Sequence, residues 1–88
     1  MEQKLETFLT LCRTMHYGKA AELLHLSQPA VSKHIQALEV QYGTALFTYQ
    51  NRRLRKTRAG ELLEQYAGQE ALVKHFFQIR KTEDTGKR

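Results

Sequence analysis

The sequence predicts a small, mainly α-helical domain with one β-hairpin, followed by a long helix that pairs two chains. Apolar residues recur at helical spacing along most of the 88-residue chain. Two short strand-like runs flank a polar tip near residue 51. The apolar stripe in the last helical segment is too large for a helix that stands alone. A chain of this length forms one domain with a modest core, which a partner chain would enlarge.

The first helix is expected over residues 2–15. Its apolar residues define one face: Leu5, Phe8, Leu9, Cys12 and Met15. No neighbouring base or electropositive pocket marks Cys12 as a catalytic thiol, so we interpret it as a small buried hydrophobe. As the single cysteine, it cannot form an internal disulfide, which fits a reducing, cytoplasmic location.

Residues 16–18 interrupt the helical pattern. Gly18 is expected to be the N-cap of a short helix from Lys19 to Leu24. A turn at His25 follows. A tight turn between crossing helices often needs a residue at positive φ, and histidine is among the non-glycine residues enriched there.

A third helix is expected to begin after the N-cap Ser27, with a proline in its first turn, and to end at Gly43. Its buried stripe is formed by Val31, Ile35, Leu38 and Tyr42. The far side carries short or hydrogen-bonding groups instead of the usual mixture of Glu and Lys: Pro29, Ser32, Lys33 and Gln36, with Gln28 beside them. Such a surface suits close contact with another molecule.

Residues 46–56 are expected to form a β-hairpin, with strands LFTYQ and RLRK around a tip at residues 50–52. Phe47 should point inward and the arginines outward. Thr57 should cap a last helix over residues 57–80, and residues 81–88 are expected to be a disordered tail. The residues expected to pair this helix with a second copy are Leu62, Leu63, Tyr66, Val73, Phe76 and Phe77.

The charge distribution favours an anionic partner. Fourteen Lys and Arg against nine Asp and Glu give a formal net charge of +5. Five basic residues lie close together with no acid among them: Arg52, Arg53, Arg55, Lys56 and Arg58. A basic cluster can be no more than a solvated face, so this one gains weight only from its place on the hairpin.

Three helices, a hairpin and a long terminal helix make a winged helix-turn-helix, with the helix-turn-helix at about 18–38 and the wing at about 46–56. In this motif the second helix of the pair enters the DNA major groove. Gln can bond adenine, Lys can donate to guanine, and Ser serves either. The sequence therefore predicts binding of double-stranded DNA. The residues expected to contact it are Ser27, Gln28, Pro29, Ser32, Lys33, Gln36, Arg52, Arg53 and Thr57.

Four segments resemble the N-terminal domain of LysR-type transcriptional regulators: LETFLTLCRT, KAAELLHLSQPAVSKHIQALE, YGTALF and TRAG. The resemblance covers residues 3 to about 65, and AAELLHLSQPAVSKHIQALE is its specific part. It implies a DNA-binding domain over residues 1–58 with a linker helix that forms a homodimer. It also implies specific binding to an inverted-repeat operator. The large effector-binding domain of such regulators is not expected in a chain that ends at Arg88.

Two positions depart from the pattern of the family. Gly18 replaces the usual Thr or Ser, and Tyr49 stands where the family usually has arginine. A minor-groove contact by the wing is therefore expected from Arg52 or Arg53.

Other classes of function fit the sequence less well. A winged helix used for protein interaction should have an acidic or apolar recognition helix and an uncharged wing, and neither holds. No enzyme, metal site or cofactor is expected, because the four histidines and the cysteine lack metal-ligand spacing. His34 is interpreted as a packing or phosphate-contacting residue. No apolar run spans a membrane, no signal peptide is expected, and no basic amphipathic helix suggests a membrane-surface role.

Overall fold

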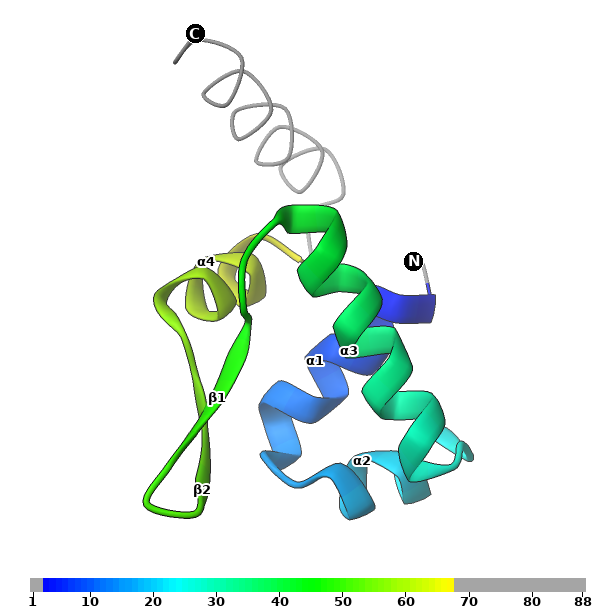
Figure 1. The fold of residues 1–88 in the computed structure, drawn as a ribbon. Helices are drawn as coiled ribbons and strands as arrows, with labels where there is room; N and C mark the ends of the chain where they lie inside the picture. Colours follow the sequence, from blue (N-terminus) through cyan, green and yellow to red (C-terminus); the bar gives the residue numbers. More distant parts are fainter. Residues whose placement is uncertain (1–2, 68–88) are drawn as a thin grey trace, which may run out of the picture.

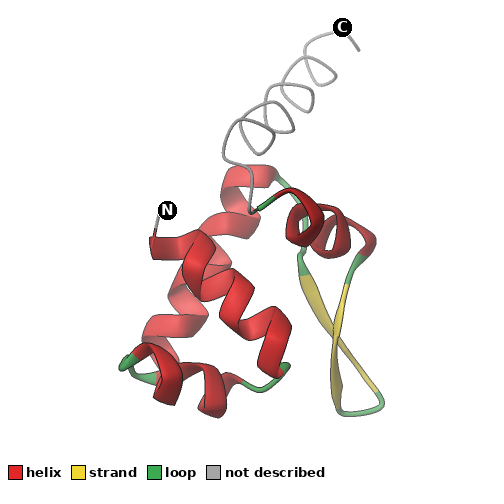
Figure 2. Ribbon diagram, turned by 180° about the vertical axis from the view of Figure 1, so that it is seen from behind, coloured by secondary structure: helices red, strands yellow, loops and turns green. Residues whose placement is uncertain are grey.

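The computed structural model describes residues 3–67, which form helices and one hairpin (Figure 1). The elements are α1 (Gln3–Thr14), α2 (Tyr17–Leu24), α3 (Gln28–Tyr42), β1 (Phe47–Gln50), β2 (Arg53–Lys56) and α4 (Arg58–Tyr66). Helices α1, α2 and α3 pack on one another, and the hairpin projects beside them like a wing (Figures 1 and 2). The predicted mainly helical, winged helix-turn-helix fold is confirmed.

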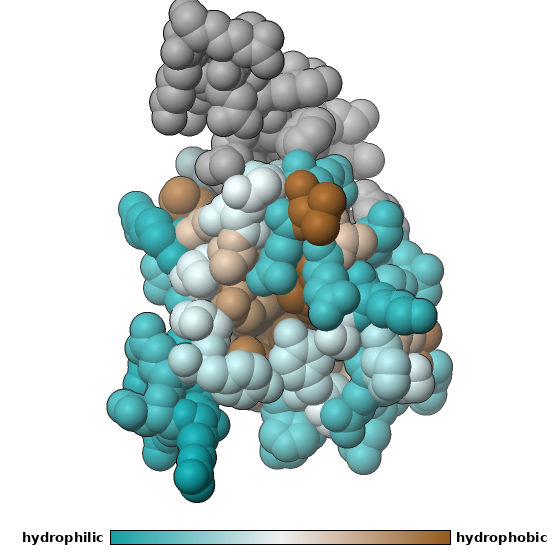
Figure 3. Space-filling view, in the orientation of Figure 1, coloured by the Kyte–Doolittle hydropathy of each residue, from teal (hydrophilic) through white to brown (hydrophobic). Residues whose placement is uncertain are grey.

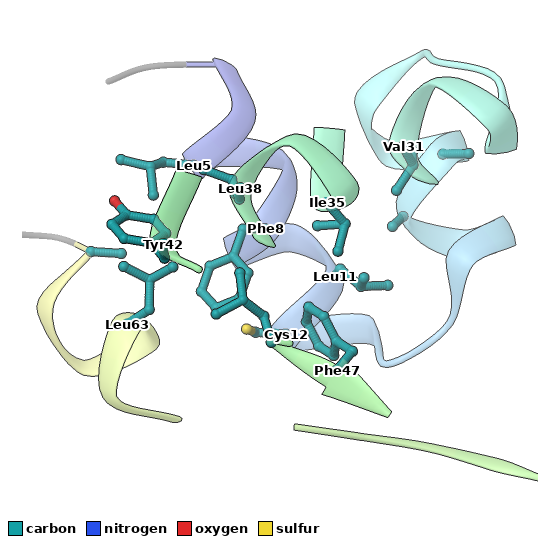
Figure 4. Close-up of a cluster of buried hydrophobic side chains, with 14 residues drawn as sticks. Leu5, Phe8, Leu11, Cys12, Val31, Ile35, Leu38, Tyr42, Phe47 and Leu63 are labelled. Atoms are coloured by element: carbon teal, nitrogen blue, oxygen red, sulfur yellow. The ribbon is translucent and has the colours of Figure 1, made fainter. Parts of the chain in front are cut away.

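The core lies where α1, α3 and the base of the wing meet (Figure 4). Phe8, Leu11 and Leu38 have no exposed surface. The rings of Phe8 and Phe47 lie 5.5 Å apart, centroid to centroid, at 56°. Burying one such side chain contributes about 1.5–3 kcal/mol. The predicted inward orientation of Phe47 is confirmed, and it ties the wing to the helices.

The buried side chains of α1 also include Thr7 and Cys12. A hydrogen bond of 2.8 Å joins Thr7 Oγ1 to Nδ1 of His34 on α3, so this histidine serves packing between helices. Cys12 is buried, and burial above all, with the negative charge of Glu64, raises the pKa of its thiol to about 12, while Lys56 acts in the opposite direction. A thiol held in its protonated form agrees with the predicted structural role.

The start of α2 differs from the sequence prediction. Its N-cap is His16, whose Nδ1 accepts a hydrogen bond of 3.0 Å from the Lys19 N–H. The helix therefore begins at Tyr17, and Gly18 lies inside the first turn, so the prediction of Gly18 as N-cap was wrong. The physical reason is that an imidazole nitrogen can accept the same hydrogen bond as the usual Ser or Asp oxygen.

The turns on either side of α3 were predicted correctly. His25 has φ 57°, and Gly43 has φ 69°. The Ser27 side chain accepts a hydrogen bond from the Ala30 N–H at 3.2 Å, and Pro29 lies in the first turn. All four residues of the predicted buried stripe are buried. These features orient α3 firmly, with its other side toward solvent.

The wing is an antiparallel hairpin that pairs Phe47 with Lys56 and Gln50 with Arg53. Its two turn residues, Asn51 and Arg52, have φ of 52° and 64°, as in the type I′ turns that suit two-residue hairpins. The tip is thus one residue shorter than predicted, because Gln50 belongs to β1.

Leu46, predicted as the first residue of the strand, precedes it and is buried. Its N–H and that of Phe47 donate to the Glu39 carboxylate at 2.8 and 3.4 Å. Its carbonyl accepts from the Thr57 N–H at 3.0 Å. Leu46 therefore joins α3, the wing and α4 instead of pairing across the hairpin.

Helix α4 begins after the predicted cap Thr57, whose hydroxyl accepts from the Gly60 N–H at 3.0 Å and donates to the Ala45 carbonyl at 2.7 Å. Leu63 is wholly buried in the core of its own chain. Because its own chain covers it, Leu63 has no exposed surface for the predicted dimer interface. Val73, Phe76, Phe77 and the remainder of the predicted helix and tail lie outside the described residues.

Candidate nucleic-acid interface

The side of α3 opposite its buried stripe carries four predicted contact residues, and a fifth, Gln28, lies beside them at the N-terminal end of the helix. We call this surface the recognition face: Gln28, Pro29, Ser32, Lys33 and Gln36. Ser32 is half-buried and the other four are exposed. Within residues 3–67, no hydrogen bond or ion pair engages the side chains of Gln28, Ser32, Lys33 or Gln36. These donors and acceptors are available to a partner, and the helix that carries them is fixed by its caps and core.

The recognition face is free of negative charge near its N-terminal end. Helix α3 has no acidic residue in its first turn, and its one acid, Glu39, is engaged by the backbone at the base of the wing. The N-terminal end of a helix also carries the positive end of the helix dipole. An anionic partner is therefore favoured at the same end where Gln28 and Pro29 lie.

The wing contributes positive charge beside this face. Of the five clustered basic residues, Lys56 pairs with Glu64 at 2.6 Å and Arg58 lies 3.8 Å from Glu61. The other three, Arg52, Arg53 and Arg55, are exposed and make no ion pair within the described part of the chain. Figure 3 shows the projecting hairpin as a strongly hydrophilic part of this side of the molecule.

A groove separates the recognition face from the wing. Its wider part, of about 490 Å³, is lined by Tyr17, Gln28, Pro29, Ser32 and Tyr49. An adjoining part of about 280 Å³ is lined by Met15, His16, Tyr17, Gly18, Gln28, Tyr49, Arg52 and Leu54. We call the two parts together the wing groove. It brings together four predicted contact residues: Gln28, Pro29, Ser32 and Arg52.

The wing groove also contains two residues that the sequence prediction missed as candidates for the site. Tyr17 starts α2 and Tyr49 lies on β1, and both line each part of the groove. Burial, with smaller effects of Tyr49 and Glu39, raises the pKa of the Tyr17 hydroxyl. That hydroxyl therefore stays protonated at neutral pH and can donate a hydrogen bond.

The two helix-capping hydroxyls among the predicted contacts differ in what they can offer DNA. The Ser27 oxygen accepts the capping bond of α3, which leaves its own proton for a phosphate. The Thr57 hydroxyl both accepts and donates within the chain. Its contribution to a DNA interface is therefore confined to the N-terminus of α4 that it caps.

A helical core, a helix-turn-helix with an available polar face and a basic hairpin define the class of winged helix-turn-helix DNA-binding domains. The family model described as "Bacterial regulatory helix-turn-helix protein, lysR family" matches residues 3–61. The chain belongs to this family, whose members are transcriptional regulators and not enzymes.

Several known proteins are similar to this chain. The HTH-type transcriptional regulator HdfR of Salmonella newport (strain SL254) is 52% identical over 63 residues, which are 72% of this chain and 23% of that protein. The chain thus spans about a quarter of the length of the curated relatives it matches.

Among residues 3–67, no helix has the length and apolar character needed to cross a membrane.

Solved structures agree with this assignment. A transcriptional regulator of the LysR family from Eggerthella lenta DSM 2243 is 51% identical, with a TM-score of 0.75 over 77% of this chain and 97% of that one. The BenM DBD in complex with catB site 1 DNA is 29% identical, with a TM-score of 0.72 over 100% and 97% of the two chains. The CbnR DBD–DNA complex is 26% identical, with a TM-score of 0.70 over 100% of both chains.

Proposed function

We propose that this protein binds a specific sequence of double-stranded DNA as a homodimer and regulates transcription in the bacterial cytoplasm. The observation that carries the proposal is the recognition face. Its available hydrogen-bonding side chains lie beside a wing with three arginines that make no ion pair within residues 3–67. Both similar DNA complexes have the same fold, which supports placing α3 in the major groove.

The residues of the recognition face have the side chains needed to contact base edges in the major groove. Gln28 can bond both N6 and N7 of adenine, and Lys33 can donate to O6 and N7 of guanine. Ser32 can donate or accept, and Pro29 offers an apolar contact for a thymine methyl. Gln36 lies two turns from the N-terminus of α3 and contacts a neighbouring base pair or the backbone.

The wing and the helix N-termini bind the DNA backbone. Arg52 and Arg53 contact phosphates or enter the minor groove, while Ser27 and the N-terminus of α4 beside Thr57 contact phosphates. These contacts set the position of the protein on the duplex without reading bases. Their charge makes the affinity depend on salt.

A homodimer on an inverted repeat follows from the apolar stripe of the linker helix. Leu62 and Tyr66 are half-buried on α4, and the stripe continues in sequence through Val73, Phe76 and Phe77. Two-fold symmetry of such an interface presents two copies of α3 to two half-sites. Sedimentation of the unmodified chain and of a variant with Val73→Glu and Phe76→Glu tests it: the first should be a dimer and the second a monomer with weakened DNA binding. A monomeric unmodified chain at high concentration contradicts the proposal.

The function itself is tested by selecting binding sites from random duplex DNA and then titrating the selected duplex at several salt concentrations. A dimer that neutralises about 6–10 phosphates should lose about 10³–10⁵ in affinity between 50 and 200 mM salt. Failure to select any sequence, together with a nearly flat salt dependence, would contradict DNA binding and favour a winged helix used for protein interaction.

A further inference from the structure

The wing groove has a composition that the proposed contacts of α3 and the wing arginines leave unexplained. Its floor is apolar, because Met15, Tyr17 and Leu54 are partly buried against the core. Its rim carries Gln28, Arg52 and other polar groups. No acidic residue is among those that line it. An apolar strip with a neutral or basic rim fits a ligand that is apolar along its length and anionic at intervals.

Tyr49 is the exposed aromatic residue of this groove. Its exposed fraction is 64%, comparable with that of Leu23 at 66% and Val40 at 82%, the large aliphatic residues exposed among residues 3–67. It lies opposite Leu54 in the register of the hairpin, so its backbone is held by the paired strand. No hydrogen bond within residues 3–67 engages its hydroxyl. The side chain is therefore positioned by the wing and free to bind.

The backbone of one DNA strand has the chemistry that this groove requires. Deoxyribose offers an apolar surface, and the phosphates on either side of it accept hydrogen bonds. Tyrosine is among the side chains that bind the sugar and phosphate groups of DNA. The wing groove runs between α3 and the wing. If α3 fills the major groove of the DNA and the wing lies beside the minor groove, the DNA strand between these two grooves passes over the wing groove.

We propose that Tyr49 is a DNA-contacting residue: its ring packs on a deoxyribose of this strand, and its hydroxyl donates to the adjacent phosphate. The inference rests on the proposed function and adds a neutral contact to it. The contact fixes the position of Gln28 over the base pairs, because both residues line the same groove. It does not itself read a base.

A neutral contact has a recognisable signature. Neutralising a phosphate with a basic residue releases a condensed counterion, and each release steepens the plot of log K against log salt by about 0.9. Tyrosine releases none. Removing Tyr49 should therefore weaken binding at every salt concentration without changing the slope, whereas Tyr49→Arg should steepen the slope by about 0.9 per subunit.

The test uses the full 88-residue chain with Tyr49→Phe, Tyr49→Ala and Tyr49→Arg, titrated by fluorescence anisotropy on a selected duplex and on a scrambled one. Val40→Ala is the matched control, since Val40 is exposed at the other end of α3. Loss of one hydrogen bond in Tyr49→Phe should lower affinity for both duplexes by about 2- to 10-fold per subunit. Tyr49→Ala should lower it further, and Val40→Ala should leave it unchanged.

The inference fails if Tyr49→Phe and Tyr49→Ala bind both duplexes as the unmodified protein does. It also fails if the affinity loss of Tyr49→Ala is accompanied by an equal loss in the free energy of unfolding, which would show a structural role. The failure of the proposed function looks different: the unmodified protein then does not distinguish the selected duplex from the scrambled one. The inference on Tyr49 alone is overturned if the unmodified protein prefers the selected duplex, Gln28→Ala removes this preference, and no change at Tyr49 alters binding. The proposed function would then still hold.

Discussion

Replacing Gly60 by alanine is expected to destabilise the fold at the joint between the wing and α4. An ideal Cβ at this position would lie 2.2 Å from the Leu46 carbonyl oxygen and 3.2 Å from its carbon. Ordinary van der Waals contacts of a Cβ begin at about 3.4 Å, so the overlap exceeds 1 Å. The Leu46 backbone cannot easily move away, because its N–H donates a hydrogen bond to Glu39 and its carbonyl accepts one from the Thr57 N–H.

Two opposing effects decide the size of the change. Alanine in place of glycine favours a helix by up to about 1 kcal/mol. Overpacking that forces the backbone to shift costs about 1–3 kcal/mol, and sometimes more. Since the obstructing atom is a bonded carbonyl and not a flexible side chain, overpacking should win. We expect a net loss of about 1–2 kcal/mol, which lowers Tm by about 5–15 °C in a domain of this size.

Thermal unfolding followed by circular dichroism, at one fixed protein concentration, measures this effect. Gly18→Ala is the matched control. A Cβ there would lie 3.0 Å from His16 Cε1 and 3.3 Å from Gln28 Nε2. Both contacts are with side-chain atoms that need to shift by only a few tenths of an ångström, so the change in stability should stay below about 1 kcal/mol. A Gly60→Ala variant as stable as the unmodified protein, or less affected than Gly18→Ala, would show that the Leu46 carbonyl does not obstruct a side chain at this position.

Three further predictions follow from single side chains. Arg52→Gly should leave the protein equally stable or stabilise it by up to about 1 kcal/mol, because φ of Arg52 is 64° and glycine carries no penalty there. The same variant should bind DNA more weakly and with a flatter salt slope, and a lower stability in urea would contradict the expected effect on the fold. Thr7→Val should cost about 1 kcal/mol in urea unfolding through loss of the bond to His34, and an unchanged midpoint would contradict it. The pKa of the Cys12 thiol is raised from 9.0 to about 12 in the folded protein, so the unfolded chain loses the thiol proton at lower pH. The stability that the protonated, buried thiol contributes is full below pH 9 and is lost as pH rises toward 12. The Cys12→Ala variant should lose less stability than the unmodified protein over that range.

Features that depend on nearby residues were predictable from the sequence. Ser27 and Thr57 were identified as caps because a hydroxyl before a helix can accept an N–H bond at close range. His25 and Gly43 were placed in turns because of the φ values they tolerate. The hairpin and the inward Phe47 followed from the alternation of apolar and polar residues. Each of these signals lies within a few residues of the feature it predicts.

Features that depend on distant residues were not predictable in the same way. Helical spacing showed that Leu63 lies on an apolar face, but not that the same chain would cover it completely. The wing groove forms only when Tyr17 and Tyr49, from separate elements, come together. His16 was missed as a cap because its capping nitrogen lies on a side chain with several possible roles. Periodicity identifies a face but does not identify what packs on it.

Whether α3 reads the DNA sequence can be decided by four titrations. Gln28→Ala and Ser32→Ala are each titrated on the selected duplex and on a scrambled duplex of equal length. We expect a loss of about 1–3 kcal/mol on the selected duplex, little change on the scrambled one, and relaxed preference at particular base pairs. Equal losses on both duplexes would show that the recognition face contacts only the DNA backbone and that α3 does not read the sequence.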